Sequence, residues 1–377
     1  MRLIPTFGEV LPLLIVTFVT AMVLAVALTP LVRRLALRLQ LVDAPNHRRV
    51  NASPVPRGGG IAVAISFLAV AIATLVANDS LQIVNLPFTI SPQQLAGLLV
   101  GGAVATLIGF LDDYFQLRAR WQLLGQVAVA GLAVASGITV TYLNNPLGSG
   151  SIVLEGPFAI GFTMVWIIGM INSINFIDGL DGLSSGIALI AAVTLGLISL
   201  TATFSQPFIA VLCFVLAGSL LGFLRWNFHP ATIFIGTSGV MFVGYTLAVL
   251  AVLGTAKVAV ALLVLGVPII DTFWIIVRRL ASGRSPFTPD RGHIHHRLLD
   301  LGLSHARTVL VIYAICVALA LLSFVLSGTG QLYAFMGLVL VSGLVLFFVT
   351  RGESGDALEA ESYEASHPDD DGGPGVG

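Results

Sequence analysis

The sequence predicts an all-α polytopic membrane protein with about eleven transmembrane helices and a short external β-hairpin. Of its 377 residues, 56% are hydrophobic and only 10% are charged. A soluble domain carries about 25% charged residues, so this composition argues against a soluble fold. The apolar residues also fall in runs long enough to cross a bilayer, which takes roughly 17–25 residues.

The predicted spans follow one another along the chain. The first is too long for the hydrophobic region of a signal peptide and no small-residue cleavage site follows it, so we expect a retained helix. Two spans are short or interrupted by glycine, and irregular backbone at membrane depth is tolerated where it lines a cavity. The spans are expected near 10–32, 58–77, 94–111, 122–138, 158–172, 184–201, 207–224, 237–254, 257–277, 308–326 and 332–349.

Two segments outside the spans have patterns of their own. Residues 138–157 alternate apolar and polar side chains around a turn at 144–148, which predicts a β-hairpin on the outer face. Residues 352–377 are acidic and rich in glycine and serine, which is typical of a disordered tail. The chain therefore divides into a membrane domain, residues 1–351, and an acidic cytoplasmic tail, residues 352–377.

The arginines predict the orientation of the chain. Of its 18 basic residues, 17 are arginines, and six lie in each of the loops 33–57 and 278–307. With eleven spans, these loops fall on the same side of the membrane, which the positive-inside rule makes cytoplasmic. Only Arg2 and Lys257 fall on the opposite side.

The most informative polar segment lies between two apolar runs, from Gly169 to Gly182. It contains Asn172, Asn175, Asp178 and Asp181. Ionisable groups beside hydrocarbon are costly and usually mark a functional polar cavity. Carboxylate and amide oxygens are the ligands that hard cations prefer, so this pattern indicates a site for a metal ion and phosphate.

Two weaker motifs accompany this segment. Asp112 and Asp113 end the third span, where adjacent carboxylates repel each other unless a cation or a shared proton relieves them. A pair of solvated acids at a helix end is the alternative. Gly236 and Thr237 open the eighth span, where free N–H groups of a helix N-terminus can bind phosphate. An ordinary helix cap is the alternative there.

A histidine-rich loop lies between the ninth and tenth spans and contains Arg291, His293, His295 and His296. Three histidines in four residues beside arginine suit diphosphate binding or proton transfer. A zinc site would lack cysteine ligands and a second histidine pair. A basic lipid-facing loop would explain the arginines but not the histidine spacing. Asp271, within the ninth span, should face protein or water rather than lipid.

All these polar elements open to the cytoplasm in the predicted topology. A transport pathway would need access from both faces of the membrane. A cluster of acids, amides and histidines on one face instead favours an enzyme that joins a soluble phosphate substrate to a membrane lipid.

The motifs resemble those of a known family over roughly residues 10–350. The family is that of the polyprenyl-phosphate N-acetylhexosamine-1-phosphate transferases, glycosyltransferase family 4, which are relatives of the MraY translocase. The His-Ile-His-His form is similar to the undecaprenyl-phosphate GlcNAc-1-phosphate transferase branch, which starts enterobacterial common antigen, O-antigen, teichoic acid or arabinogalactan. The motifs that carry the resemblance are Asp112-Asp113, 172–183, Asn227 with Pro230-Ala231, and 286–296.

This resemblance implies a reaction and its partners. N-acetylhexosamine 1-phosphate, with GlcNAc as the expected sugar, would pass from a UDP-sugar to undecaprenyl or decaprenyl phosphate, and UMP would be released. Mg²⁺ is the implied cofactor, with Mn²⁺ as an alternative ion. The implied location is the bacterial cytoplasmic membrane, with a homodimer as a candidate assembly and no nucleic-acid partner.

The resemblance also implies roles for individual residues. The implied catalytic residues are Asp112, Asp113, Asp178 and Asp181. The implied metal ligands are Asp113, Asn175 and Asp178. The implied substrate-binding residues are Asn172, Asn175, Gly236, Thr237, Arg291, His293, His295 and His296.

One position departs from the family pattern. The loop before the eighth span usually reads Gly-Asp-x-Gly with a metal-binding aspartate, whereas this chain has Thr237 there. A hydroxyl is a neutral and weaker Mg²⁺ ligand than a carboxylate. Several interpretations stay open. Nearby acids such as Asp113 or Asp178 could complete the metal shell, or the protein could be a weakly active or non-catalytic lipid-binding relative. The same chemistry with another UDP-sugar is a further alternative.

Overall fold

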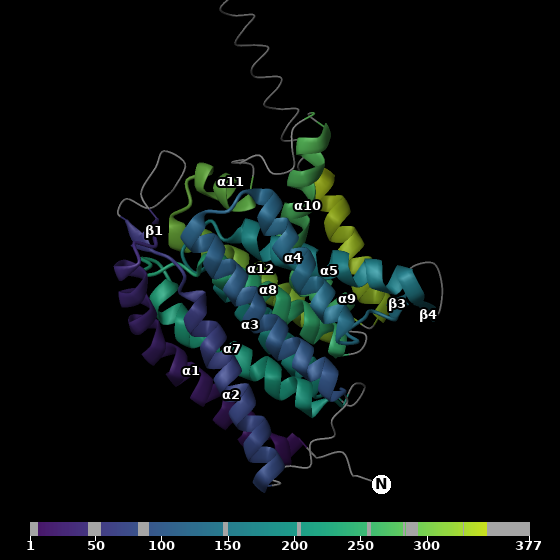
Figure 1. Ribbon diagram of the computed structural model, residues 1–377. Helices are drawn as coiled ribbons and strands as arrows, with labels where there is room; N and C mark the ends of the chain where they lie inside the picture. Colours follow the sequence, from purple (N-terminus) through teal and green to yellow (C-terminus); the bar gives the residue numbers. More distant parts are fainter. Residues whose placement is uncertain are drawn as a thin grey trace, which may run out of the picture. The chain divides into compact units, whose positions relative to one another are not determined.

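The protein is an all-α polytopic membrane protein (Figure 1). Within the described residues of the computed structural model, seven helices are long and apolar enough to cross a membrane. These are α1 (Phe7–Arg38), α2 (Gly60–Leu81), α3 (Pro92–Phe115), α5 (Gly156–Ile177), α7 (Pro207–Asn227), α8 (Gly236–Leu253) and α12 (His305–Val325). The described residues are 7–43, 54–81, 90–145, 150–201, 205–254, 258–281, 283, 293–326 and 328–344.

The remaining helices are shorter or broken. Helices α9 (Val258–Val264) and α10 (Gly266–Ala281) meet at a bend of 79° and form an eighth span if they are counted together. Helices α4 (Ala119–Ala135), α6 (Leu183–Ser199) and Gly328–Leu344 lie where spans were predicted, but they fall below the length of a clear span. The structure therefore supports seven or eight of the eleven predicted spans.

Two short antiparallel strand pairs and one short helix complete the described elements. Strands β3 (Tyr142–Asn144) and β4 (Ser151–Val153) pair where the hairpin was predicted. The location of this strand pair on the outer face of the membrane stays a prediction. Strands β1 (Val42–Asp43) and β2 (Val55–Pro56) join the two ends of the first loop. Helix α11 (Ile294–Asp300) begins within the predicted histidine-rich loop, so His293 is its N-cap residue and His295 and His296 lie in its first turn.

The contacts divide the chain into two units, Met1–Tyr333 and Ala334–Gly377. The first unit contains every labelled helix and strand and all the residues of the candidate site described below. The predicted acidic tail, residues 352–377, lies outside the described residues.

Helices α7 and α8 form the core of the first unit. Both are buried around most of their circumference, as expected for helices without a polar face. Helix α7 packs against α1 and α6, and α8 packs against α3 and α5. Gly218 and Gly222, four residues apart on α7, let it approach α1 closely. A Cβ atom added at either glycine would lie 2.2 Å from a backbone carbonyl oxygen of Phe18 or Met22. Small residues at this spacing are a common means of packing transmembrane helices.

Successive helices run in alternating directions, so their polar ends gather on one side. Gly60 at the start of α2 donates its N–H to the carbonyl of Ile235 before α8, at 2.8 Å. The guanidinium of Arg33 near the end of α1 donates to the carbonyl of Thr232, at 3.1 Å. We call this side the polar end; it also includes the loop from Asp178 to Gly182 between α5 and α6.

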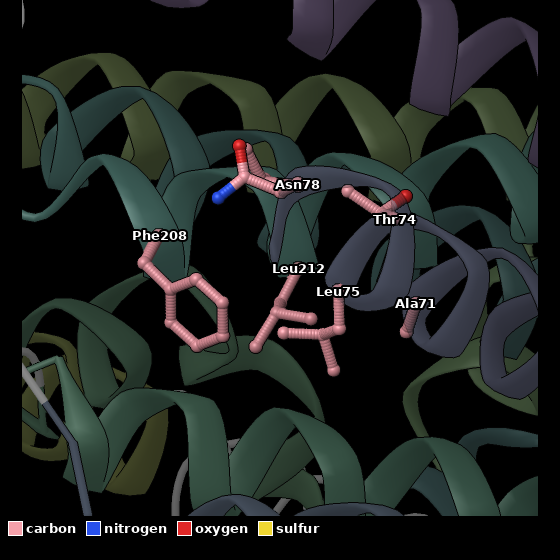
Figure 2. Close-up of a pocket in the computed structure, with 7 residues that line it drawn as sticks. Ala71, Thr74, Leu75, Asn78, Phe208 and Leu212 are labelled. Atoms are coloured by element: carbon pink, nitrogen blue, oxygen red, sulfur yellow. The ribbon is translucent and has the colours of Figure 1, made fainter. Parts of the chain in front are cut away.

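A small apolar recess lies between α2 and α7, away from the polar end (Figure 2). On α2 its lining residue nearest the polar end is Ala71, roughly 16 Å along the helix from Gly60 at about 1.5 Å per residue. It therefore cannot take part in chemistry at the polar end. It is lined by Ala71, Thr74, Leu75, Asn78, Phe208, Val211 and Leu212.

The close α1–α7 contact yields a stability prediction. Gly218→Ala should destabilise the fold by about 1–3 kcal/mol, because the new methyl group meets backbone that cannot rotate away. Thermal unfolding of the purified protein in detergent measures the effect. Gly131→Ala on α4 is the matched control, since its Cβ would meet nothing within 4 Å. Equal melting temperatures for the two variants would contradict the close contact.

Candidate functional site

The loop between α5 and α6, which we call the acid loop (Asp178–Gly182), is the centre of the site. Gly182 has φ +78°, a left-handed conformation that glycine adopts without strain, and it allows the chain to enter α6. Asp178 accepts a hydrogen bond from the hydroxyl of Ser184 at 2.5 Å. Burial raises the pKa of Asp178 to about 7 despite this bond, and the negative charges of Asp113 and Asp181 add to the increase. A cation at this position would relieve the accumulated negative charge.

Asp181, at the other end of the acid loop, is held by hydrogen bonds. Its Oδ2 atom lies 2.8 Å from His229 Nδ1 and accepts the N–H of Ala231 at 3.0 Å. Its own N–H donates to His305 Nε2 at 2.9 Å. The rings of His229 and His305 stack with centroids 4.3 Å apart. We call Asp181, His229 and His305 the Asp181 clasp.

The clasp has the composition of a metal site, but its ligand atoms are already engaged in hydrogen bonds. One ligand atom from each residue lies within 4.8 Å of the others. However, the lone pair of His305 Nε2 already accepts a backbone N–H, and Asp181 Oδ2 already has two neighbours within 3.0 Å. The clasp therefore fixes the acid loop to the start of α12 and to the loop after α7.

Asp113 connects α3 to the N-terminus of α8. Its two carboxylate oxygens accept the N–H groups of Thr237 and Ser238, at 2.9 and 3.0 Å. Arg57 donates to the carbonyl of Asp113 at 2.8 Å and places its Nε atom 3.9 Å from the carboxylate. The N–H groups of Thr237 and Ser238 are thus engaged within the protein. This favours a capped helix end over a phosphate cradle at these two groups.

Two further predicted residues make helix-to-helix contacts. Asp112 is 6% exposed and accepts hydrogen bonds from the N–H of Leu117 and the amide of Gln122, at 3.1 and 2.8 Å. These bonds fix the turn between α3 and α4. Asn172 donates to Gln126 Oε1 at 2.7 Å, which joins α5 to α4. The structure therefore places both side chains in structural contacts.

The described part of the histidine loop starts at His293, and Arg291 lies outside the described residues. Its three rings form a group: His293 stacks on His295 with centroids 5.4 Å apart, and His295 lies 4.4 Å from His296. His295 is 1% exposed. Burial, together with the neighbouring histidines, lowers the pKa of His295 to about 3, so its ring is neutral.

His295 brings the histidine loop into contact with the acid loop. A Cβ atom added at Gly179 would lie 2.2 Å from His295 Nε2, so the ring occupies the space where another residue would have its side chain. The charge of His305 also acts on His295, which places the Asp181 clasp nearby. The structure thus brings Asp113, Asp178, Asp181 and the histidines together at the polar end.

Asn175 differs from the other amide of the motif. It lies one helical turn before Asp178 and is half-buried. Its side-chain amide makes no hydrogen bond to another residue in the described part of the chain. Asn175 and the second oxygen of Asp178 therefore have free acceptor capacity, whereas Asp113 and Asp181 are largely engaged.

Sequence reasoning missed several residues of this arrangement. His229 follows Asn227 in a motif that was recognised, and His305 lies three residues before the predicted span 308–326, so a polar residue near a span boundary was the available signal. No sequence pattern distinguishes the other missed residues, Ser184, Gln122 and Gln126.

Comparison with known proteins identifies similar sequences. The model of a family described as glycosyl transferase family 4 matches residues 95–255. A Bacillus subtilis protein named probable undecaprenyl-phosphate N-acetylglucosaminyl 1-phosphate transferase is 35% identical over 335 residues, which cover 87% of this chain and 89% of the relative.

Other relatives carry related names. Decaprenyl-phosphate N-acetylglucosaminephosphotransferase of Mycobacterium leprae is 37% identical over 78% of this chain and 79% of its own length. Undecaprenyl-phosphate alpha-N-acetylglucosaminyl 1-phosphate transferase of Escherichia coli is 27% identical over 76% of each chain.

The contact between Gly179 and His295 can be tested without an activity assay. Gly179→Ala should displace the His295 ring and make it reactive toward diethyl pyrocarbonate, which modifies accessible neutral imidazoles. Mass spectrometry of the modified peptides measures the change. Gly169→Ala on α5 is the control, because a Cβ there meets nothing within 4 Å. If His295 stays protected in both variants, the two loops are not in contact.

Proposed function

Because this chain belongs to glycosyl transferase family 4, we propose that it transfers N-acetylglucosamine 1-phosphate from UDP-N-acetylglucosamine to polyprenyl phosphate and releases UMP. The observation that carries this proposal is the convergence of the acid loop and the histidine loop at the polar end. Relatives that match most of this chain are named for this transfer between a soluble nucleotide sugar and a lipid.

The proposed reaction is a phosphoryl transfer. An oxygen of polyprenyl phosphate attacks the β-phosphorus of the UDP-sugar, and the bond from that phosphorus to the bridging oxygen breaks. The electron pair leaves with UMP, and the product is a polyprenyl diphosphate sugar. Such reactions depend mainly on positioning and on electrostatic stabilisation of the transferred group. The buried, pre-positioned groups of the polar end fit this requirement.

The residues of the acid loop fit a bound Mg²⁺ ion, with Mn²⁺ as an alternative. Asp178 has a free oxygen, and its pKa is raised mainly by burial and in addition by the negative charges of Asp113 and Asp181. Asn175 adds a free amide oxygen one turn away, and Asp113 contributes its charge from α3. A bound divalent ion would neutralise the diphosphate. Asp178 and Asn175 would hold the ion, and Asp113 keeps its predicted place in the metal shell.

The protein residues have distinct proposed roles around this ion. Asp181 fixes the acid loop through its clasp, so that Asp178 keeps its orientation. The histidines, with Arg291 from the segment before them, bind the nucleotide end of the donor. Asp112 and Asn172 support the helices that carry Asp113 and the acid loop, and Gly236 lets the Asp113 carboxylate approach α8. A Cβ at Gly236 would lie 2.7 Å from that carboxylate.

We also propose that the polar end faces the cytoplasm of a bacterial inner membrane. The segregated arginines support this orientation. The alternating helix directions also support a membrane crossing by the short helices α4 and α6. Each of these helices starts at the polar end, and the helix that follows it ends there, so each must lead away from the polar end. Eleven spans then follow if Gly328–Leu344 also crosses. Assembly as a homodimer stays a prediction.

Thr237 supports a second candidate function. The family's metal-binding aspartate is absent at this position, so a weakly active or non-catalytic lipid-binding relative would keep the fold and lose the chemistry. The free acceptor groups of Asp178 and Asn175 favour the catalytic proposal. The choice of UDP-sugar depends on loop shape, and another UDP-sugar with the same chemistry is the remaining alternative.

The direct test is UMP release by purified protein supplied with UDP-N-acetylglucosamine, polyprenyl phosphate and Mg²⁺. We expect turnover that is lost on chelation with EDTA and restored by Mg²⁺. Asp178→Asn should reduce turnover by about 100-fold, the scale observed when one pre-organised electrostatic group is removed. No UMP release with any of several UDP-sugars would favour the non-catalytic alternative.

The position of Thr237 yields a gain-of-function prediction. Thr237→Asp should lower the Mg²⁺ concentration needed for half-maximal turnover and raise the rate, because a carboxylate adds an anionic oxygen ligand. An aspartate in the first turn of α8 also suits the helix dipole. Thr232→Asp, an exposed position in the preceding loop, controls for added charge. An unchanged Mg²⁺ dependence in an active enzyme would show that another acid already fills the metal shell.

A further inference from the structure

Asp271 is an acid within α10 that the proposed reaction does not use. Its Oδ2 atom lies 2.8 Å from His293 Nδ1, and its Oδ1 atom accepts the N–H of Ile294 at 2.9 Å. The side chains of Asp271 and His293 are only 10% and 11% exposed. Both carboxylate oxygens therefore bind His293 and Ile294, 22 and 23 residues further along the chain.

This contact determines the hydrogen-bonding state of His293. An ionised carboxylate can only accept hydrogen bonds, so Nδ1 of His293 must carry a proton. The second ring nitrogen, Nε2, is then available to contact a ligand, and it has no hydrogen-bond partner within the described residues. A carboxylate that orients an imidazole in this way fixes both its tautomer and its direction.

The surroundings keep the His293 ring in one orientation. The ring of Phe176, two residues before Asp178, packs edge-on against the His293 ring, with the ring centroids 6.0 Å apart. On its other side His293 stacks on His295, which rests against Gly179 of the acid loop. A row of contacts thus leads from Asp271 on α10 through His293 and His295 to the acid loop. His295 Nδ1 is buried without a hydrogen-bond partner, whereas Nε2 is the unpartnered nitrogen of the His293 ring that Asp271 orients.

We propose that Asp271 is a positioning residue for the nucleotide-sugar donor. It holds His293 so that Nε2 faces the diphosphate of the bound UDP-sugar. An imidazolium in this place donates to Asp271 through one nitrogen and to a phosphate oxygen through the other. The inference rests on the proposed function and assigns donor recognition, rather than lipid binding, to the Asp271–His293 pair.

The test compares steady-state constants for Asp271→Asn and the wild-type enzyme. An amide replaces one of the two acceptor oxygens by an NH2 donor, so it cannot accept hydrogen bonds from both the Ile294 N–H and the His293 Nδ1–H in the observed arrangement. We expect the KM for UDP-N-acetylglucosamine to rise on the order of 10-fold. The KM for polyprenyl phosphate should stay the same, and kcat should change much less than the donor KM. Asp300→Asn, an exposed acid at the far end of α11, is the control and should match wild type.

A double-mutant cycle separates positioning from general destabilisation. His293→Ala should raise the donor KM to a similar extent, and the Asp271→Asn/His293→Ala double variant should lose little more than either single variant. Asp271→Glu keeps the charge and should recover part of the donor affinity. If Asp271→Asn does not fold, the donor KM of His293→Ala tests the proposal by itself. An unchanged donor KM in His293→Ala overturns the proposal.

The outcomes distinguish this inference from the proposed function. A wild-type enzyme that neither binds UDP-N-acetylglucosamine in calorimetry nor releases UMP overturns the proposed function, and the inference with it. An active wild type with an unchanged donor KM in Asp271→Asn overturns the inference alone. Additive effects in the double variant also overturn it, because the two residues would then act separately.

Discussion

The arrangement of the polar end depends on one buried carboxylate, Asp113. It sits at the end of α3 and accepts the first N–H groups of α8, which need a partner because a helix start leaves them unsatisfied. The helix dipole and Arg57 balance its charge. Gly58, Gly109 and Gly236 have no side chains at this junction, so backbone and carboxylate approach closely. The bond fixes α3 to α8, and α8 in turn packs against α5, which carries the acid loop.

The acid loop is held on two sides by pairs of aspartate and histidine. On one side, Asp181 binds His229 and the start of α12. On the other, Asp271 binds His293, whose neighbour His295 rests on Gly179. Asp178 lies between these two supports with an oxygen free. A reactive group that is held by its neighbours in this manner needs little reorganisation when substrate binds, which is an effective way to stabilise developing charge.

The sequence predicted the helices well because hydrophobic runs report directly on burial in a membrane. It also identified the acid loop and the histidine loop, because charged residues beside such runs are rare. The 79° bend between α9 and α10 was not predicted from the continuous apolar run, although Gly266 and Pro268 lie at it. The role of Asp113 was equally hidden, because its partners are backbone groups with no residue signature. Nothing in the pattern around Gly179 shows that an imidazole fills the space of its side chain.

The long separation between Asp113 and its partners has a consequence for biosynthesis. Asp113 is made 124 residues before Thr237, whereas Arg57 is made 56 residues before Asp113. When α3 enters the membrane, Arg57 is therefore available as a counter-charge but the N-terminus of α8 is not. Until α8 inserts, water and Arg57 must stabilise the carboxylate at the membrane surface. His305 is made 68 residues after Thr237, so α12 completes the polar end only after α8 has been made.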